Sequence, residues 1–292
     1  MKKLLKELQK SKIEHLTNPN FKDYSSIKLD QPFNLLIKPK TYKEIKKTIC
    51  FLRDRKIEYS FIGNCTNSFI TTNNIVLISL MYIKRINTIK KNYIVVSANC
   101  LMSNLALTYS KMSIKTFIGG TCIPGSIGAG IYINAGIKGI CISKYLYKVL
   151  VLDLTTLKLR YILSKNIMFK YRESNLINCI ILRLYFKKVY DNNSLLFYNY
   201  LKDYRKNQPN GLSLGSVFKN FTDKPSGIVL DNLGLKGVSY KHFFISPIHA
   251  NFIISDGYGK AIDFYIFLKL IILFTYIKTG RILYPEVKIL NK

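Results

Sequence analysis

The stretch FIGGTCIPGSIGAGIYINAG, residues 117–136, is the most distinctive part of this sequence, because six of its twenty residues are glycine. Glycine allows a backbone to turn and to approach a ligand where a side chain would clash, and backbone N–H groups exposed in such a loop can bind phosphate. The order Gly125-x-x-Gly128-x-Gly130 matches neither the Rossmann fingerprint nor the P-loop. Alone, the stretch is either a set of tight turns or a ligand site.

A second glycine-bearing loop, GNCTN at residues 63–67, lies earlier in the chain. The segments before it predict a strand at 35–37, a helix from the capping box Thr41/Glu44 to about residue 55, and a strand at 59–62. Two loops of this kind in one domain favour a ligand-binding role.

The remaining pattern mixes helices and strands without an internal repeat, which predicts an α+β fold. A Lys- and Asn-containing region near 187–194 is the predicted domain boundary. Predicted strands cover residues 75–80, 93–98, 147–154, 179–186, 216–219 and 251–255. Predicted helices cover residues 101–112, 195–206, 227–233 and 259–279.

The most apolar segment, 261–279, invites comparison with a membrane span. It carries Asp263, Lys269 and Lys278, and its charge-free run, 270–277, is too short to cross a bilayer. We therefore predict no membrane span and a buried amphipathic helix that ends at Gly280.

Composition favours a cytoplasmic protein. Lys and Arg number 45 against 16 acidic residues, a net charge of +29. The lysines are spread along the chain and the abundant residue types are those of an AT-rich genome, so no specific nucleic-acid partner is predicted, although anionic substrates are favoured. Six cysteines without a CxxC pair and three histidines predict no metal site. Reduced thiols without a signal peptide point to the cytoplasm.

Three polar stretches stand among apolar residues: GSVFKN at 215–220, YRES at 171–174 and YPEV at 284–287. Taken singly, the first is an ordinary strand and the other two are surface salt bridges or turns.

Taken in order, these stretches and both glycine loops make the chain resemble the UDP-N-acetylenolpyruvoylglucosamine reductase family, over about residues 25–290. Further matches are GLKG at 234–237 and HANFII at 249–254. The chain is similar to the shorter type of the family, which lacks an inserted loop in the last domain.

The resemblance implies an α+β fold with a vanillyl-alcohol-oxidase-type FAD-binding domain of two lobes and a smaller α+β substrate-binding domain. On this view 1–24 is an N-terminal extension, 25–190 is the FAD-binding domain with lobes of about 25–80 and 81–190, and 191–292 is the C-terminal substrate domain.

The resemblance also implies the site residues. The catalytic set is Ser216, Arg172 and Glu286, and the substrate contacts are Lys219 and Asn220. Residues expected to bind FAD without a covalent link are Gly63, Asn64, Cys65, Thr66, Asn67, Thr121, Pro124, Gly125, Ser126 and Gly128.

The implied reaction is NADPH-dependent, FAD-mediated reduction of the UDP-sugar enolpyruvyl ether to UDP-N-acetylmuramate, a step of peptidoglycan synthesis, cell wall biogenesis, cell shape and cell division. Hydride passes to the vinyl carbon, Ser216 gives a proton to the adjacent carbon, and Arg172 and Glu286 stabilise charge at the carboxylate. The group that assists Ser216 is left open between Lys219 and a water molecule.

Two alternatives remain open: another flavin oxidoreductase of the same fold, and a degenerate, non-catalytic basic binding protein. The oligomeric state is not predicted. The chain departs from the family pattern at Asp30-Gln31, where Gly-Gly is usual, at Cys65 and Cys122, where glycine is usual, at Thr66, where serine is usual, and at Phe221, where proline is common.

Overall fold

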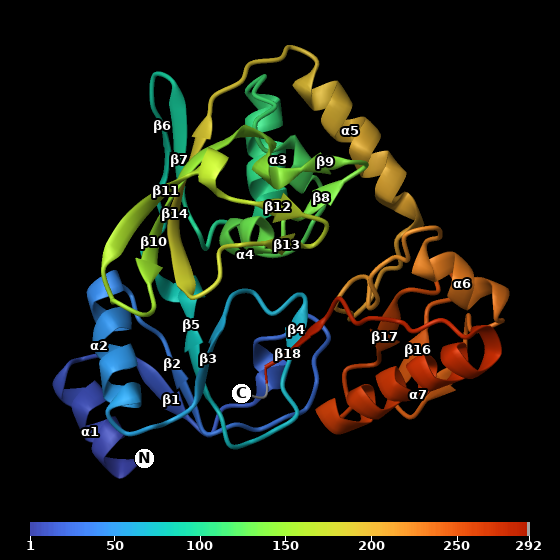
Figure 1. The fold of residues 1–292 in the computed structure, drawn as a ribbon, viewed down its shortest axis with the longest axis horizontal. Helices are drawn as coiled ribbons and strands as arrows, with labels where there is room; N and C mark the ends of the chain where they lie inside the picture. The colour runs from blue at the N-terminus through green and yellow to red at the C-terminus, as the bar shows by residue number, and fades with distance from the viewer. Residues whose placement is uncertain (291–292) are drawn as a thin grey trace. The chain divides into compact units, whose positions relative to one another are not determined.

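The computed structural model describes residues 1–290, which fold as two compact units built from interleaved segments (Figure 1). Unit 1 contains 1–14, 38–56 and 79–205, and unit 2 contains 15–37, 57–78 and 206–290 of the described chain. These units do not follow the predicted boundaries, since the predicted first lobe, 25–80, contributes to both of them. The assignment of the ranges to FAD and substrate domains stays a prediction.

Unit 1 is built on a five-stranded antiparallel sheet with the order β11-β10-β14-β7-β6. Its strands are β6 (Asn87–Ile89), β7 (Tyr93–Ser97), β10 (Leu146–Asp153), β11 (Leu159–Leu163) and β14 (Cys179–Lys187). Two short hairpins add β8 (Gly136–Ile137) with β9 (Ile140–Cys141), and β12 (Phe169–Lys170) with β13 (Glu173–Ser174).

The helices of unit 1 are α1 (Lys2–Lys10), α2 (Tyr42–Arg53), α3 (Met102–Lys111), α4 (Ile127–Tyr132) and α5 (Ser194–Tyr204). The predicted cap is present, because the Thr41 side chain accepts a hydrogen bond from Glu44 N at 3.2 Å. The Glu44 carboxylate accepts one at 2.9 Å from Lys40 N, one residue before the N-cap. Helix α3 lies beside α5 (Figure 1).

Unit 2 carries a four-stranded sheet in the order β1-β2-β5-β3 and a three-stranded sheet in the order β15-β16-β17. The first contains β1 (His15–Thr17), β2 (Leu35–Ile37), β3 (Tyr59–Ile62) and β5 (Val76–Ser79). The second contains β15 (Ser239–Tyr240), β16 (Phe243–Ile245) and β17 (Ile253–Ser255). The parallel pair β4 (Ser68–Phe69) and β18 (Lys288–Ile289) joins the first segments of the unit to the last.

Helices α6 (Ser226–Asn232) and α7 (Ala261–Thr279) complete unit 2. Gly280 ends α7 in the left-handed conformation, with φ of 68°, as predicted. The predicted amphipathic character is wrong: the buried side packs in the core, but the opposite side is also apolar, with Ile262, Leu270 and Leu273 exposed. Among residues 1–290, no helix is long and apolar enough to cross a membrane.

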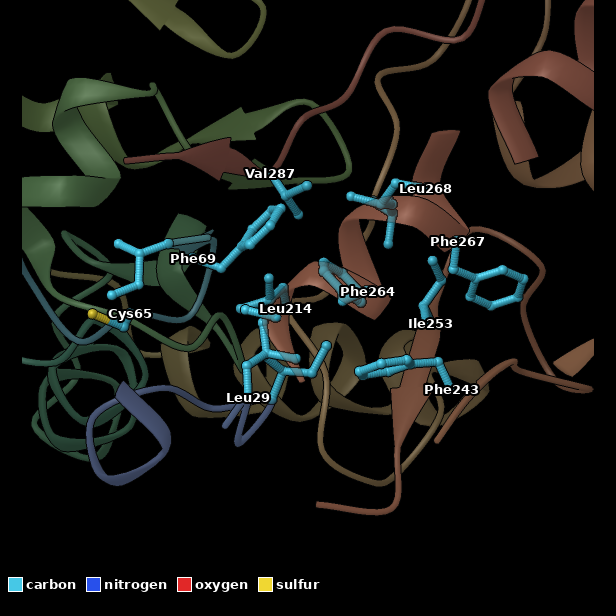
Figure 2. Close-up of a cluster of buried hydrophobic side chains, with 14 of the residues drawn as sticks. Leu29, Cys65, Phe69, Leu214, Phe243, Ile253, Phe264, Phe267, Leu268 and Val287 are labelled. Carbon is cyan, nitrogen blue, oxygen red and sulfur yellow. The ribbon is translucent and has the colours of Figure 1, made fainter. Parts of the chain in front are cut away.

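The core of unit 2 gathers side chains from distant segments, including Leu29, Phe69, Leu214, Phe264 and Val287 (Figure 2). The Phe264 ring is fully buried and packs against two other aromatic rings. Its centroid lies 5.0 Å from that of Phe69 and 5.4 Å from that of Phe243. Because these rings come from α7, β4 and β16, Phe264 ties the elements of the unit together.

We expect Phe264→Ala to destabilise unit 2 by about 3–5 kcal/mol, because it removes buried aromatic surface and leaves a cavity. The measurement is urea unfolding followed by circular dichroism. Leu273→Ala, on the exposed side of the same helix, is the control and should change stability by less than about 0.5 kcal/mol. Equal losses in both variants would contradict the packing assignment.

Candidate functional site

The predicted strand at 216–219 is not a regular strand. Ser216 and Phe218 instead form isolated antiparallel bridges to two different partners, Phe252 and Pro285. Gly215 precedes them with φ of +78°, and Pro285 has no N–H with which to extend a ladder. The segment therefore lies as a single extended connection between two others, and Ser216 is half-buried.

Ser216 and Glu286 are brought together by the backbone. Glu286 N donates a hydrogen bond to Val217 O at 2.7 Å, and Lys219 N donates one to Tyr284 O at 2.9 Å. Two of the three residues predicted to be catalytic thus lie on adjacent segments of unit 2, each half-buried.

The first glycine-bearing loop meets the same segment. The Asn67 side chain donates from Nδ2 to Glu286 O at 3.2 Å, and Lys288 N donates to Asn67 O at 2.9 Å. The loop predicted to bind a cofactor therefore contacts the backbone of Glu286 within unit 2.

Positive charge gathers beside Glu286. The Lys288 ammonium is partly desolvated, which lowers its pKa, and the nearby charge of Lys219 lowers the pKa further. Two neighbouring ammonium groups favour an anionic ligand at this place. Asn220 is exposed, and its Oδ1 accepts a hydrogen bond from Ser226 N at 3.1 Å.

Arg172 belongs to unit 1, so it is not among the residues that the unit 2 network brings together. It lies in the turn of the β12–β13 hairpin with φ of 57°, and its guanidinium stands over the Tyr171 ring, 5.0 Å from the centroid. The Ser174 hydroxyl donates to Tyr132 O at 2.7 Å, which fixes the hairpin to the end of α4.

Asn134 provides the second tie to this hairpin. Its Nδ2 donates to Lys170 O at 3.2 Å, and its Oδ1 accepts from the Ser143 hydroxyl at 2.7 Å. Neither Asn134 nor Ser174 is among the predicted site residues, although both stand inside distinctive stretches of the sequence. Their role could have been predicted from the sequence, because each is a small polar residue beside a predicted turn in a distinctive stretch.

A second concentration of positive charge lies at Arg172. Burial lowers the pKa of the Arg205 guanidinium, and the charge of Arg172 lowers it further. The Cys122 Sγ lies 4.0 Å from the Tyr198 hydroxyl oxygen, so the second glycine-bearing loop contacts α5 in the same unit.

The second loop is shaped by close packing. A Cβ at Gly128 would lie 2.6 Å from Ala98 Cβ and 3.1 Å from Ala98 O, so only glycine fits. Gly125 has φ of 108°, and Ser126 caps α4 by accepting from Ala129 N at 3.5 Å. Thr121 is fully buried and its hydroxyl donates to Ile118 O at 2.8 Å, whereas Pro124 is exposed.

Both loops offer free backbone donors. Within residues 1–290, the N–H groups of Asn64, Cys65 and Thr66 donate no hydrogen bond, and neither do those of Gly125 and Ser126. Unpaired N–H groups in tight loops suit the oxygens of a phosphate. The first loop belongs to unit 2 and the second to unit 1, and the free N–H groups of each suit an anionic oxygen ligand.

The Cys65 thiol of the first loop is a candidate ligand for a metal ion. In the described part of the chain, no three His, Cys, Asp or Glu side chains gather to hold a metal ion. The Cys65 thiol is buried, and burial raises its pKa to about 12, so it is a neutral thiol at physiological pH.

With this geometry in place, comparison with known proteins identifies the family. The model of the UDP-N-acetylenolpyruvoylglucosamine reductase C-terminal domain matches residues 207–290. The UDP-N-acetylenolpyruvoylglucosamine reductase of Prochlorococcus marinus subsp. pastoris is 30% identical over 284 residues, which cover 93% of this chain and 95% of that protein. The chain belongs to the UDP-N-acetylenolpyruvoylglucosamine reductase family.

Two further comparisons agree with this family. The UDP-N-acetylenolpyruvoylglucosamine reductase of Bacillus licheniformis is 29% identical over 270 residues, covering 89% of this chain and 88% of that protein. For the fold, the crystal structure of the reductase from Thermus caldophilus has a TM-score of 0.78 at 23% identity, over 95% of this chain and 98% of that chain. The predicted family resemblance and the α+β fold class are confirmed.

Two departures from the family pattern have a backbone consequence. Cys65 and Cys122 stand where glycine is usual, and both adopt the left-handed conformation, with φ of 45° and 54°. A residue with a Cβ is destabilised there by about 1–2 kcal/mol.

We expect Cys122→Gly to stabilise unit 1 by about 1 kcal/mol, because glycine adopts this conformation without strain. The measurement is the shift of the urea midpoint. Cys50→Gly, inside α2, is the control and should destabilise, because glycine is a poor helix former. A less stable Cys122→Gly variant would count against the strain.

His249 makes the stability of unit 2 depend on pH. Its Nδ1 accepts a hydrogen bond from Asn251 N at 3.1 Å, which requires a neutral ring. Burial lowers the pKa of His249 below its ordinary value of 6.5, and the charge of Lys236 lowers it further.

A histidine whose pKa is lower in the folded chain contributes stability that is full above the unfolded pKa and is lost as pH falls through the folded pKa. We therefore expect unit 2 to lose stability as the pH falls below about 6.5, the ordinary pKa of a histidine. His249→Gln should reduce this dependence, measured as urea unfolding at each pH. The same slope in the variant and the unmodified protein would remove His249 as its source.

Proposed function

We propose that this chain reduces the enolpyruvyl ether of UDP-N-acetylglucosamine to UDP-N-acetylmuramate, with non-covalently bound FAD and with NADPH as hydride donor. Membership of the reductase family supports this reaction, which belongs to the synthesis of peptidoglycan precursors in the cytoplasm. The observation that carries the proposal is the hydrogen bond from Glu286 N to Val217 O, the residue after Ser216, in a unit whose first glycine-bearing loop has free N–H groups.

The two loops are the proposed cofactor contacts. The N–H groups of Asn64, Cys65 and Thr66 in one loop, and of Gly125 and Ser126 in the other, would bind pyrophosphate oxygens of FAD. FAD, when bound, supplies hydride transfer between NADPH and the substrate. Proton donation and the stabilisation of charge are the proposed tasks of this chain's own side chains.

Ser216 is the proposed acid. When hydride reaches the vinyl carbon, negative charge develops on the adjacent carbon and its carboxylate, and the Ser216 hydroxyl gives its proton to that carbon. A serine alkoxide is costly unless positive charge is near. Lys219, three residues along the same segment, is the proposed source of that charge, although a water molecule could also relay the proton.

Arg172, as a cation, and Glu286, as a carboxylic acid in its protonated form, are the proposed partners of the substrate carboxylate. A guanidinium binds a carboxylate in a fixed geometry, and an oriented group of this kind lowers the barrier by about 3 kcal/mol. Lys219 and Lys288 add positive charge that favours the UDP phosphates, and Asn220, exposed beside them, is a further proposed contact.

We expect Ser216→Ala to retain bleaching of the flavin by NADPH and to slow recolouring by the enolpyruvyl substrate by about 10²–10⁴-fold. The measurement is anaerobic stopped-flow absorbance of the flavin. Ser239→Ala, an exposed serine in unit 2, is the control and should behave as the unmodified protein.

Unchanged recolouring in Ser216→Ala would remove Ser216 as the acid. The same apparatus separates the competing functions. Another flavin oxidoreductase of this fold would be bleached by an alcohol rather than by NADPH. A non-catalytic basic protein would be colourless and would bind DNA with a steep salt dependence.

A further inference from the structure

Asn251 holds the segment that carries Ser216 from the side opposite Glu286. Its side chain is 3% exposed and lies against Phe218, which is 1% exposed. Its Oδ1 accepts a hydrogen bond from Phe218 N at 2.9 Å, and its Nδ2 donates one to Phe218 O at 2.8 Å. One amide thus satisfies both backbone groups of a residue that has no regular strand beside it.

The backbone of Asn251 holds the preceding residue. Val217 N donates to Asn251 O at 2.9 Å, while Val217 O accepts from Glu286 N at 2.7 Å. Val217 is therefore held through both of its backbone groups, by Asn251 through its N–H and by Glu286 through its carbonyl. Ser216 is the preceding residue, and its carbonyl belongs to the same peptide as the Val217 N–H.

Asn251 is itself fixed. Its N–H donates to His249 Nδ1, and the adjacent residue Phe252 forms the bridge to Ser216. Because both amide atoms have buried backbone partners of opposite type, the side chain has one satisfied orientation.

We propose that Asn251 is a positioning residue of the reduction, which acts by holding Ser216 and Glu286 in one register. The inference rests on the proposed function of these two residues. An amide is needed because it offers a donor and an acceptor on one planar group. A carboxylate loses the donor and sets an oxygen against Phe218 O, and alanine leaves both buried backbone groups unpaired.

The test is anaerobic stopped-flow of both half-reactions in the FAD-bound, full-length protein carrying Asn251→Asp. Bleaching by NADPH should stay within about twofold, and recolouring by the enolpyruvyl nucleotide should slow about 100-fold, since a displacement of the order of 1 Å costs that much. Asn251→Ala should show the same separation of the two half-reactions if the loss comes from position and not from the carboxylate charge.

Thr116→Ala is the matched control. Thr116 is a buried side chain of unit 1 that also joins two backbone groups, donating to Lys187 O at 2.9 Å and accepting from Val189 N at 3.2 Å. Its variant should lose stability to a similar extent and keep the ratio of the two half-reaction rates. An equal loss of both rates in the Asn251 variants, in proportion to folded protein, overturns the proposal.

A double-mutant cycle identifies the residue through which Asn251 acts. In a Ser216→Ala background, Asn251→Asp should slow recolouring by less than about threefold further, because coupled residues are not additive. A full additional loss of about 100-fold overturns the proposed route through Ser216. If the unmodified protein itself is not bleached by NADPH and recoloured by the nucleotide, the proposed function fails, and this result is distinct from either outcome for Asn251.

Discussion

The hydrogen bond from Glu286 N to Val217 O is the contact on which the arrangement of unit 2 depends. It joins residues 69 positions apart, and the segment after Glu286 continues into the parallel pairing of β18 with β4. One connected path of hydrogen bonds therefore links the glycine-bearing loop before β4, the backbone of Glu286 and the residue that follows Ser216.

This path is built from irregular backbone rather than from sheet. Ser216 and Phe218 each pair with a different segment, so no single partner strand fixes both of them. Amide side chains hold the backbone instead, since Asn251 binds Phe218 and Asn67 binds Glu286. In a regular strand the side on which each side chain lies is set by alternation, whereas an irregular segment is free of that constraint. Amide side chains stabilise such a segment because they satisfy buried N–H and C=O groups together.

Local signals in the sequence were sufficient for elements whose ends depend on neighbouring residues. Thr41 and Glu44 fixed the start of α2, and Gly280 fixed the end of α7, because caps involve residues within one turn. The Ser216 segment was wrongly predicted as a strand, since alternation of side chains does not reveal whether a partner strand exists. The interleaving of the two units and the role of Asn251 depend on contacts between distant residues, which no local pattern contains.

The cysteines at 65 and 122 indicate which constraints this chain can relax. Each is a left-handed residue that carries a Cβ, at a cost of about 1–2 kcal/mol. Gly128 is different, because a Cβ there would meet Ala98 Cβ at 2.6 Å and its carbonyl oxygen at 3.1 Å. A stable unit tolerates the strain of a left-handed φ at Cys122. A side chain at Gly128 would instead overlap the backbone of Ala98, so the loop itself would have to move.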